Sequence, residues 1–412
     1  MKTLVRILSI CVLVTLIAGC AAPAATPTPK PAPTTAPPQP TQPPTPTPEP
    51  TLTPNEQWMK AAELGKFAPA KQDWAAIEAA AKKEGKVIVY ANSSRIEKAA
   101  AMFMEKYPEI TVEGYDLGGD DAIIKVREEQ KAGAYVGDVW YSGGGPDIIG
   151  DFLPKGYLVP FVPDDLLDVI PPEARNPLVV ARYGVRVLGY NTELNPNGCP
   201  ITNWWQLTEP EWKGKVFIED PLTDASTMGI LTTIAAHAEE LAAAYRERYG
   251  KDPVLDPDTP DAGWLWVKKF AQNSPVPEPG GDEVVQAFAT PGMKEAGVGF
   301  TSYSKYRDTQ KGKLVFDACK GVKPVMGVQT QAYLAVINRA PHPNAAKLFI
   351  RFVLNEGFEP WNVVGDYSAR TDVPAPKGAI PRNELSVWTQ DNAYVYANIA
   401  KMRDFWAMNL LK

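Results

Sequence analysis

Two short polar clusters stand between a predicted strand and a predicted helix, and both carry groups that bind anions. Asn92, Ser93 and Ser94 follow a β-rich run at residues 86–90 and precede a helical pattern. Asp224, Ser226 and Thr227 stand in the same way before a second helical pattern. Free N–H groups and the helix dipole at a helix N-terminus favour an anion, and hydroxyl groups add donors. We expect these residues to contact a ligand, with plain helix capping as the alternative.

A glycine-rich turn follows a third strand pattern. Trp140 and Tyr141 end this run, and Ser142, Gly143 and two further glycines come next. Glycine lets the backbone approach a ligand closely, and an aromatic ring can stack on one. We expect Tyr141, Ser142 and Gly143 to contact ligand; a tight turn with Trp140 in the core is the alternative. The spacing of the glycines does not match a dinucleotide-binding fingerprint.

A further group of candidate ligand contacts lies in the second half of the chain. Ser302 and Tyr303 follow a strand pattern at residues 298–301. Arg186 lies on another predicted strand, and Arg307 is a second cation near Tyr303. Hydroxyls, a phenol and a guanidinium suit a small anion or a polar organic molecule. For both arginines a surface salt bridge is the alternative.

The elements that must position these residues alternate between strand and helix. Such alternation implies an α/β fold in which doubly wound, mostly parallel sheets carry the site. Asp73 is a plausible N-cap and Gly85 a stop signal for the first of these helices. The predicted elements of the first unit cover residues 74–84, 86–90, 96–107, 110–115, 122–131 and 139–142. Those of the second cover residues 185–190, 215–219, 227–248, 298–301, 333–337, 344–354 and aromatic-rich helices from 387.

The N-terminus has the features of a secretion signal. Lys2 and Arg6 precede an apolar run at residues 7–17, which is too short to span a bilayer. The run leads to Ala18, Gly19 and Cys20, an ending that resembles the bacterial lipobox, in which the cysteine is lipidated and becomes the mature N-terminus. Residues 21–54 are nearly all Pro, Thr or Ala and predict an extended spacer. We therefore expect a signal peptide at residues 1–19, a lipidated linker at 20–55, and an extracytoplasmic protein anchored to the membrane through this lipid alone.

Charge and cysteine content narrow the possible partners. The formal net charge of −6 argues against a nucleic-acid partner. Once Cys11 leaves with the signal peptide and Cys20 is lipidated, Cys199 and Cys319 remain. Outside the cytoplasm these two cysteines can pair, and two free buried thiols are the alternative.

A dispersed set of motifs resembles the type 2 periplasmic solute-binding proteins of ABC transporters, in the branch that includes ferric-iron and sugar-phosphate binders. The set spans about residues 85 to 375 and keeps the family's order. Its pieces are Tyr190-Asn191-Thr192, Trp205-Gln206-Leu207, Trp212-Lys213-Gly214-Lys215-Val216, Asp220-Pro221, the stretch from Pro341 to Phe349, and Gly365-Asp366-Tyr367-Ser368-Ala369-Arg370. Ser368 stands where the family usually has proline.

The resemblance implies two α/β lobes joined by crossover strands, which close around a ligand and present a surface to the permease of an ABC importer. The expected lobes are residues 56–185 with the return at 326–412, and residues 186–325. In iron-binding relatives an adjacent tyrosine pair ligates ferric iron, whereas here Tyr303 and Tyr306 are three residues apart. Ferric iron on Tyr303 and Tyr306 is thus the alternative to a small polar or anionic ligand. We expect a monomer without a cofactor.

Two other function classes remain. An enzyme is disfavoured because the G-x-S-x-G, P-loop, H-E-x-x-H and C-x-x-C patterns are absent and neither His237 nor His342 is placed for chemistry. A sensor that binds a solute and reports to a receptor cannot be separated from an importer component by sequence.

Overall fold

The computed structural model describes residues 52–118, 120–295 and 297–410, so the predicted signal peptide, Cys20 and most of the linker lie outside the described residues. Residues 52–412 form a single unit. No helix within the described ranges is long and apolar enough to cross a membrane.

The first half of the sheet consists of three parallel strands in the order β2-β1-β3. These strands are β1 (Lys86–Ala91), β2 (Thr111–Asp116) and β3 (Val139–Ser142). The helices of this part are α2 (Trp74–Glu84), α3 (Arg95–Lys106), α4 (Asp121–Ala132), α5 (Gly145–Asp147), α6 (Leu153–Lys155) and α12 (Pro343–Leu354). A π-helical turn, η2 (Ile148–Phe152), joins α5 to α6.

The second half of the sheet repeats this arrangement. Strand β6 pairs in parallel with both β7 and β8. The strands are β6 (Val216–Glu219), β7 (Val276–Glu278) and β8 (Val298–Ser302). The helices of this part are α7 (Ala225–Ala236), α8 (Ala238–Tyr249), α9 (Ala262–Gln272), α10 (Gly281–Ala289) and α11 (Tyr306–Gln310).

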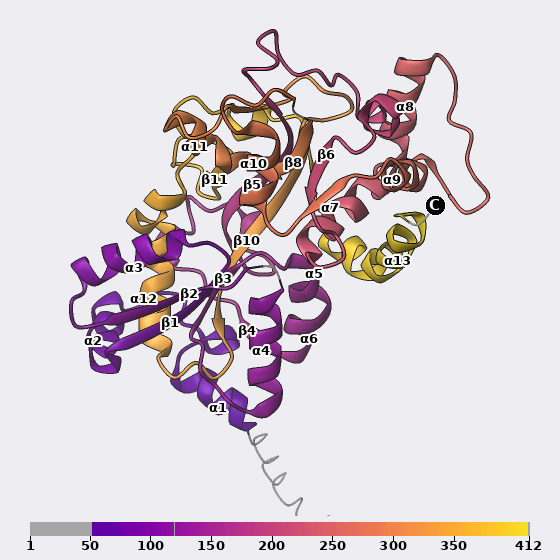
Figure 1. The fold of residues 1–412 in the computed structure, drawn as a ribbon. Helices are drawn as coiled ribbons and strands as arrows, with labels where there is room; N and C mark the ends of the chain where they lie inside the picture. Colours follow the sequence, from indigo (N-terminus) through magenta and orange to yellow (C-terminus); the bar gives the residue numbers. More distant parts are fainter. Residues whose placement is uncertain (1–51, 119, 296, 411–412) are drawn as a thin grey trace, which may run out of the picture. The chain divides into compact units, whose positions relative to one another are not determined.

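Two long strands join the halves. β5 (Val179–Asn191) and β10 (Gly327–Ile337) pair antiparallel with each other, and they also pair antiparallel with β8 and β3, respectively. The full order is β2-β1-β3-β10-β5-β8-β6-β7, and Figure 1 shows β10 between the two groups of elements. The short strands β4 (Leu158–Val159) and β12 (Val387–Thr389) pair with β10, whereas β9 (Phe316–Ala318) and β11 (Asp366–Ser368) pair with β5. Helices α1 (Pro54–Ala61) and α13 (Asn392–Leu410) begin and end the described chain.

These observations confirm the predicted α/β class. The predicted lobe boundary at residues 185 and 186 falls inside β5, and that at 325 and 326 falls just before β10. Because both strands run through both halves, no sharp division exists at either point. The lobe limits stay a prediction.

Local signals fix several elements as predicted. The Asp73 carboxylate accepts a hydrogen bond from the Ala76 amide at 3.0 Å and caps α2. Gly85 ends the helix with φ of 70°, a left-handed conformation that glycine adopts at little cost.

Several predicted limits are wrong. The helix expected at residues 227–248 breaks at His237, whose backbone is not helical and whose ring stacks on Trp388 at 4.3 Å. Residues from 387 form β12 before α13 begins. The linker was expected to reach residue 55, yet Thr53 caps α1, which begins at Pro54. In the first two cases contacts distant in sequence override the local pattern.

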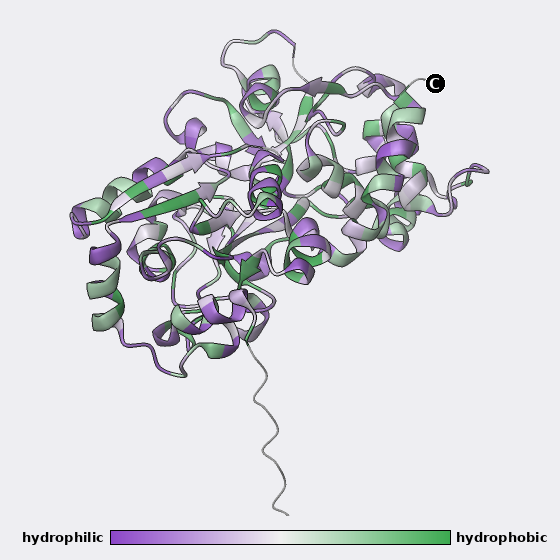
Figure 2. Cartoon of the chain, turned by 90° about the horizontal axis from the view of Figure 1, so that it is seen from below, coloured by the Kyte–Doolittle hydropathy of each residue, from purple (hydrophilic) through white to green (hydrophobic). Residues whose placement is uncertain are grey.

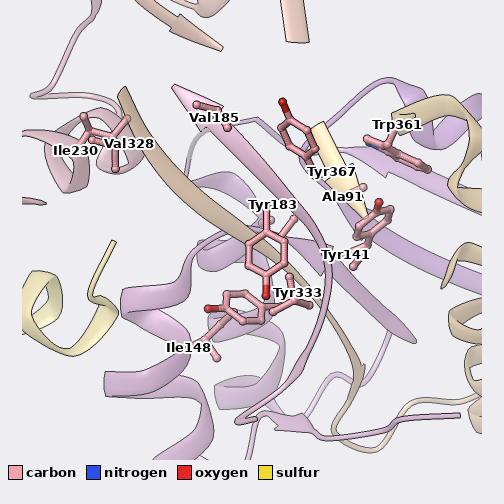
Figure 3. Packing of buried hydrophobic residues seen from close by; sticks show 14 of the residues in the cluster. Ala91, Tyr141, Ile148, Tyr183, Val185, Ile230, Val328, Tyr333, Trp361 and Tyr367 are labelled. Atoms are coloured by element: carbon pink, nitrogen blue, oxygen red, sulfur yellow. The ribbon is translucent and has the colours of Figure 1, made fainter. Parts of the chain in front are cut away.

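Large aromatic side chains fill the core. Tyr141 packs edge-on against Trp361 at 4.7 Å between ring centroids, and Figure 3 shows these rings together. Trp204 packs against Trp266, Phe300 and Trp388 in the second half. Figure 2 shows hydrophobic residues on the inner strands and hydrophilic ones on the outer loops.

The structure joins Cys199 and Cys319 in a disulfide across 120 residues of chain, which is the paired alternative of the two that the sequence left open. Cys319 is fully buried. The bond ties the segment after β5 to the turn after β9.

Replacing both cysteines, as in Cys199→Ser/Cys319→Ala, should lower the free energy of unfolding by about 2–4 kcal/mol, because a closed loop of this length restricts the unfolded chain. Urea unfolding of both proteins without reductant measures the difference. Equal unfolding midpoints, with mass mapping that finds free thiols in the wild type, would contradict the bond.

Candidate functional site

A cleft of about 580 Å³ opens between the two halves of the sheet. Its walls are strand ends and helix starts: β1, β3 and the N-termini of α3, α4 and α5 from the first half, and β6, β8 and the N-termini of α7 and α10 from the second. The middle parts of β5 and β10 line it between them. Ligands of open α/β sheets bind at this position, outside the carboxyl ends of parallel strands.

Most of the residues predicted to contact ligand do line this cleft. They come from both halves of the sheet, although up to about 210 residues separate them along the chain. These residues are Asn92, Ser93, Ser94, Ser142, Gly143, Arg186, Asp224, Ser226 and Ser302.

Tyr141, Thr227 and Tyr303 do not line the cleft. Tyr141 faces Trp361 in the core, and burial raises the pKa of its phenol. Thr227 is buried, and its amide donates to the Asp224 carboxylate at 2.6 Å. The Tyr303 hydroxyl donates to Asp317 at 3.2 Å, and burial raises the pKa of this phenol as well. Tyr141 and Tyr303 follow their strands as predicted, whereas Thr227 lies in the first turn of α7.

The N-terminus of α3 is open toward the cleft. Ser94 occupies the N-cap position but makes no capping hydrogen bond with its side chain. The Ser93 hydroxyl accepts a long bond, 3.4 Å, from the Arg95 amide. Both serines line the cleft, so amide and hydroxyl donors remain there for an anion.

The N-terminus of α7 differs from the prediction. Asp224 accepts the Thr227 amide and thereby caps the helix with its own negative charge. Because a carboxylate already occupies this helix end, α7 is a poor partner for a second anion. We expected the N-termini of both helices to bind an anion, and only that of α3 remains available for one.

A group of arginines surrounds one buried carboxylate at one end of the cleft, which we call the basic end. Asp366 of β11 is only 1 % exposed, and it accepts from Arg95 at 2.7 Å and from Arg182 at 2.9 Å. Arg95 also donates to the Ser304 hydroxyl at 3.2 Å. Arg307 donates to the Ser304 carbonyl at 2.8 Å and lies close enough to lower the pKa of Arg95, after the larger effects of burial, Asp366 and Arg182. Arg307 also lies 3.7 Å from the Asp308 carboxylate, so the basic end holds three guanidinium groups against two carboxylates.

Strand β5 presents this charge because alternate residues of a strand share a face. Arg182, Gly184 and Arg186 all line the cleft. A Cβ atom on Gly184 would lie 3.3 Å from both the Arg182 guanidinium and the Asp366 carboxylate, so glycine leaves room for this ion pair. Arg186 forms an ion pair with Glu219 of β6.

Sequence reasoning identified Arg186 and Arg307 but missed Arg95, Arg182 and Asp366. The predicted strand began at residue 185, whereas β5 begins at Val179. A longer strand would have placed Arg182 on the face of Arg186. Asp366 had no local signal, because pairing of β11 with β5 brings it to the site.

Three neighbouring carboxylates form a second charged part of the cleft lining, which we call the acidic end. Asp120, Asp147 and Asp224 line it. Burial, and then the nearby charges of Asp224 and Asp147, raise the pKa of Asp120. These oxygens can accept hydrogen bonds from hydroxyl groups of a ligand.

The predicted iron ligands are not assembled in the cleft. Neither Tyr303 nor Tyr306 is among its lining residues. Within the described part of the chain, no group of three or more His, Cys, Asp or Glu side chains is arranged to hold a metal ion.

Comparison with known proteins agrees with this architecture. The family model described as bacterial extracellular solute-binding protein matches residues 86–361. No curated protein matches the chain by sequence.

Solved structures share the fold at low sequence identity. Iron-bound HitA from Pseudomonas aeruginosa has a TM-score of 0.61 at 18% identity, covering 78% of this chain and 99% of that one. The periplasmic binding protein AfuA from Actinobacillus pleuropneumoniae, with fructose 6-phosphate bound, has a TM-score of 0.61 at 18% identity, covering 79% and 99%. Apo ferric ion-binding protein A from Pasteurella haemolytica has a TM-score of 0.57 at 14% identity, covering 79% and 98%.

Asp120→Asn should raise the free energy of unfolding at pH 7. The raised pKa means that the folded state disfavours the charged form, so this cost is fully present above the folded pKa. This destabilisation by the charged Asp120 carboxylate falls as the pH drops through the folded-state pKa. It is gone below the ordinary aspartate pKa of about 3.9. Urea unfolding of both proteins at pH 7 and at lower pH should therefore show a gain that shrinks on acidification.

Asp121→Asn is the matched control, because its exposed carboxylate lies in the first turn of the same helix and interacts favourably with the helix dipole. It should bring no gain at pH 7. A destabilised Asp120→Asn protein would show that this carboxylate is needed in its charged form.

Proposed function

Since the chain belongs to the bacterial extracellular solute-binding proteins, we propose that it captures a small organic anion in the cleft and delivers it to the permease of an ABC importer. The relatives by family and fold are binding proteins, and we extend this role, without catalysis, to the present chain.

The basic end is the observation that carries the proposal. Three guanidinium groups, from Arg95, Arg182 and Arg307, face two carboxylates: Asp366, which pairs with Arg95 and Arg182, and Asp308, which lies 3.7 Å from Arg307. Positive charge in this partly buried place therefore exceeds its counter-charge. Guanidinium groups bind carboxylate and phosphate oxygens through paired, charge-assisted hydrogen bonds. The open N-terminus of α3, at Ser93 and Ser94, adds neutral donors beside Arg95.

The acidic end suits the rest of such a molecule. Carboxylates of Asp120, Asp147 and Asp224 accept hydrogen bonds but repel a second anionic group. A ligand with its charge at one end and hydroxyl groups at the other fits both ends. Sugar phosphates and hydroxy acids have this character, and AfuA, which shares the fold, was solved with fructose 6-phosphate.

Ferric iron is the alternative cargo. Several structures with this fold are of iron-bound or ferric-ion-binding proteins, HitA and ferric ion-binding protein A among them. In the present chain the two candidate tyrosines lie outside the cleft lining, so we rank this alternative second.

We further propose that the chain is a lipoprotein held at the outer side of the cytoplasmic membrane through Cys20. The sequence Leu16-Ile17-Ala18-Gly19-Cys20, followed directly by the proline-rich spacer, supports this proposal. A spacer of polyproline character keeps a domain away from its lipid anchor. We expect a monomer.

Cys20→Ala should abolish membrane anchoring, because the lipid is the only expected attachment. Fractionation of expressing cells measures the share of protein in the membrane pellet. Ser9→Ala within the apolar run is the control and should leave that share unchanged. Equal pelleting of the Cys20→Ala protein would rule out the lipid anchor.

Binding is tested by calorimetric titration of ligand-stripped protein with fructose 6-phosphate, citrate, a neutral polyol and ferric citrate. At least one organic anion should bind, and Arg307→Gln should weaken it by about tenfold or more, since one charge-assisted hydrogen bond contributes about 1.5–3 kcal/mol. Lys311→Gln, an exposed residue on the same short segment, should leave the affinity unchanged. Binding of the polyol alone, or of ferric iron with loss in Tyr303→Phe, would contradict the proposal.

A further inference from the structure

The last helix of the chain, α13, packs on both halves of the sheet. It begins beyond residue 361, where the family match ends. It contacts α5 and η2 of the first half and α7 and α9 of the second. Figure 1 shows α13 beside α5 on one side and α7 and α9 on the other. No other long helix of the described chain has contacts of this extent with both halves.

Close packing attaches the start of α13 to the first half. The ring of Tyr396 lies directly over Gly150 of η2, where an added Cβ would come within 2.2 Å of it. Asn392 covers Gly145 in the same way and donates a hydrogen bond to the Tyr333 hydroxyl of β10 at 2.8 Å. Glycine at positions 145 and 150 is what lets the helix approach so closely.

Aromatic contacts attach the remainder of α13 to the second half. Phe405 packs edge-on against Trp264 at 5.0 Å, and Trp406 lies 5.8 Å from Phe270. Both partners belong to α9. Lys401 lies over the Trp264 ring at 4.5 Å. Phe405, Trp406 and the neighbouring Met402 are buried.

The same segment forms part of the cleft wall. Ile399 of α13 and Gln390 just before it are lining residues. Gln390 also faces Gly229 of α7, and its backbone N–H donates to the backbone carbonyl of Gln329 in β10 at 3.0 Å. The wall is therefore fixed to the second half and to β10, the strand that joins the halves.

We propose that α13 is a brace that holds the two halves of the sheet near the closed arrangement and, through Ile399 and Gln390, forms one wall of the ligand cleft. Strands β5 and β10 alone would allow hinge opening. With α13 in place, opening must separate the Tyr396 and Asn392 contacts from the first half, or the aromatic contacts from the second. This role of α13 does not depend on which ligand the cleft binds.

Distance measurement by pulsed electron spin resonance tests the brace on ligand-free, full-length protein. Spin labels at Glu105→Cys in α3 and Glu247→Cys in α8, both exposed, report the separation of the halves. The labelled wild type should give one narrow distribution. Asn392→Ala/Tyr396→Ala should broaden it toward longer distances, because both changes remove contacts with the first half. Asn392→Ala also removes the hydrogen bonds with Tyr333 of β10 and with Gln390. Met408→Ala, an exposed residue of α13, is the control and should keep the narrow distribution.

The second readout is affinity for fructose 6-phosphate, and it rests on the proposed function. Since apparent affinity falls with the fraction of binding-competent protein, Tyr396→Ala should bind several-fold more weakly although this residue does not line the cleft. The single variant is used here because Asn392 accepts a hydrogen bond from Gln390, which does line it. If no tested anion binds the wild type, the proposed function is contradicted. The spin-label distance distributions of the ligand-free proteins still test the bracing role of α13. A folded double variant with the wild-type distance distribution would overturn it. Should the double variant not fold, the distance distribution is measured on Tyr396→Ala alone, since this side chain is half-exposed. A wild-type distribution in that variant would likewise overturn the proposal.

Discussion

One buried carboxylate organises the cleft. Asp366 is almost inaccessible, and it neutralises two guanidinium groups that would otherwise repel each other in a poorly solvated place. Removing one partner of such a buried set leaves an uncompensated charge, which typically costs about 3–5 kcal/mol. Arg95 comes from the first half of the sheet, Arg182 from a strand shared by both, and Arg95 reaches Ser304 of the second half. This carboxylate therefore fixes both the charge of the basic end and the geometry between the halves.

The remaining architecture follows from the need to bring these groups together. Asp366 reaches the site because β11 pairs with β5, and Gly184 opposite it has no side chain to obstruct the ion pairs. The outer parallel strands end at the cleft with their helices starting there, which leaves amide donors free at α3. The same geometry at α7 gives a different result, because Asp224 caps that helix with a charge. Residue type at one position thus decides whether a helix start attracts an anion.

Sequence reasoning reached as far as local signals allow. Asp73 and Gly85 limit α2 as predicted, and strand ends placed Ser93, Ser142 and Ser302 at the cleft. Tyr141 and Tyr303 were also predicted to contact ligand, yet they pack against Trp361 and Asp317 and do not line the cleft. Periodicity gives two faces but not which of them is packed. Asp366 and Arg95 meet across 271 residues, and no local pattern reports such a contact.

We propose that the cleft holds an organic anion at its basic end. Native mass spectrometry of protein purified without denaturation, followed by identification of the released molecule, tests it most directly. We expect an equimolar adduct that proves to be an organic anion and is lost or strongly reduced in the Arg307→Gln protein. An adduct identified as ferric iron or as a neutral solute, retained in that variant, would contradict it.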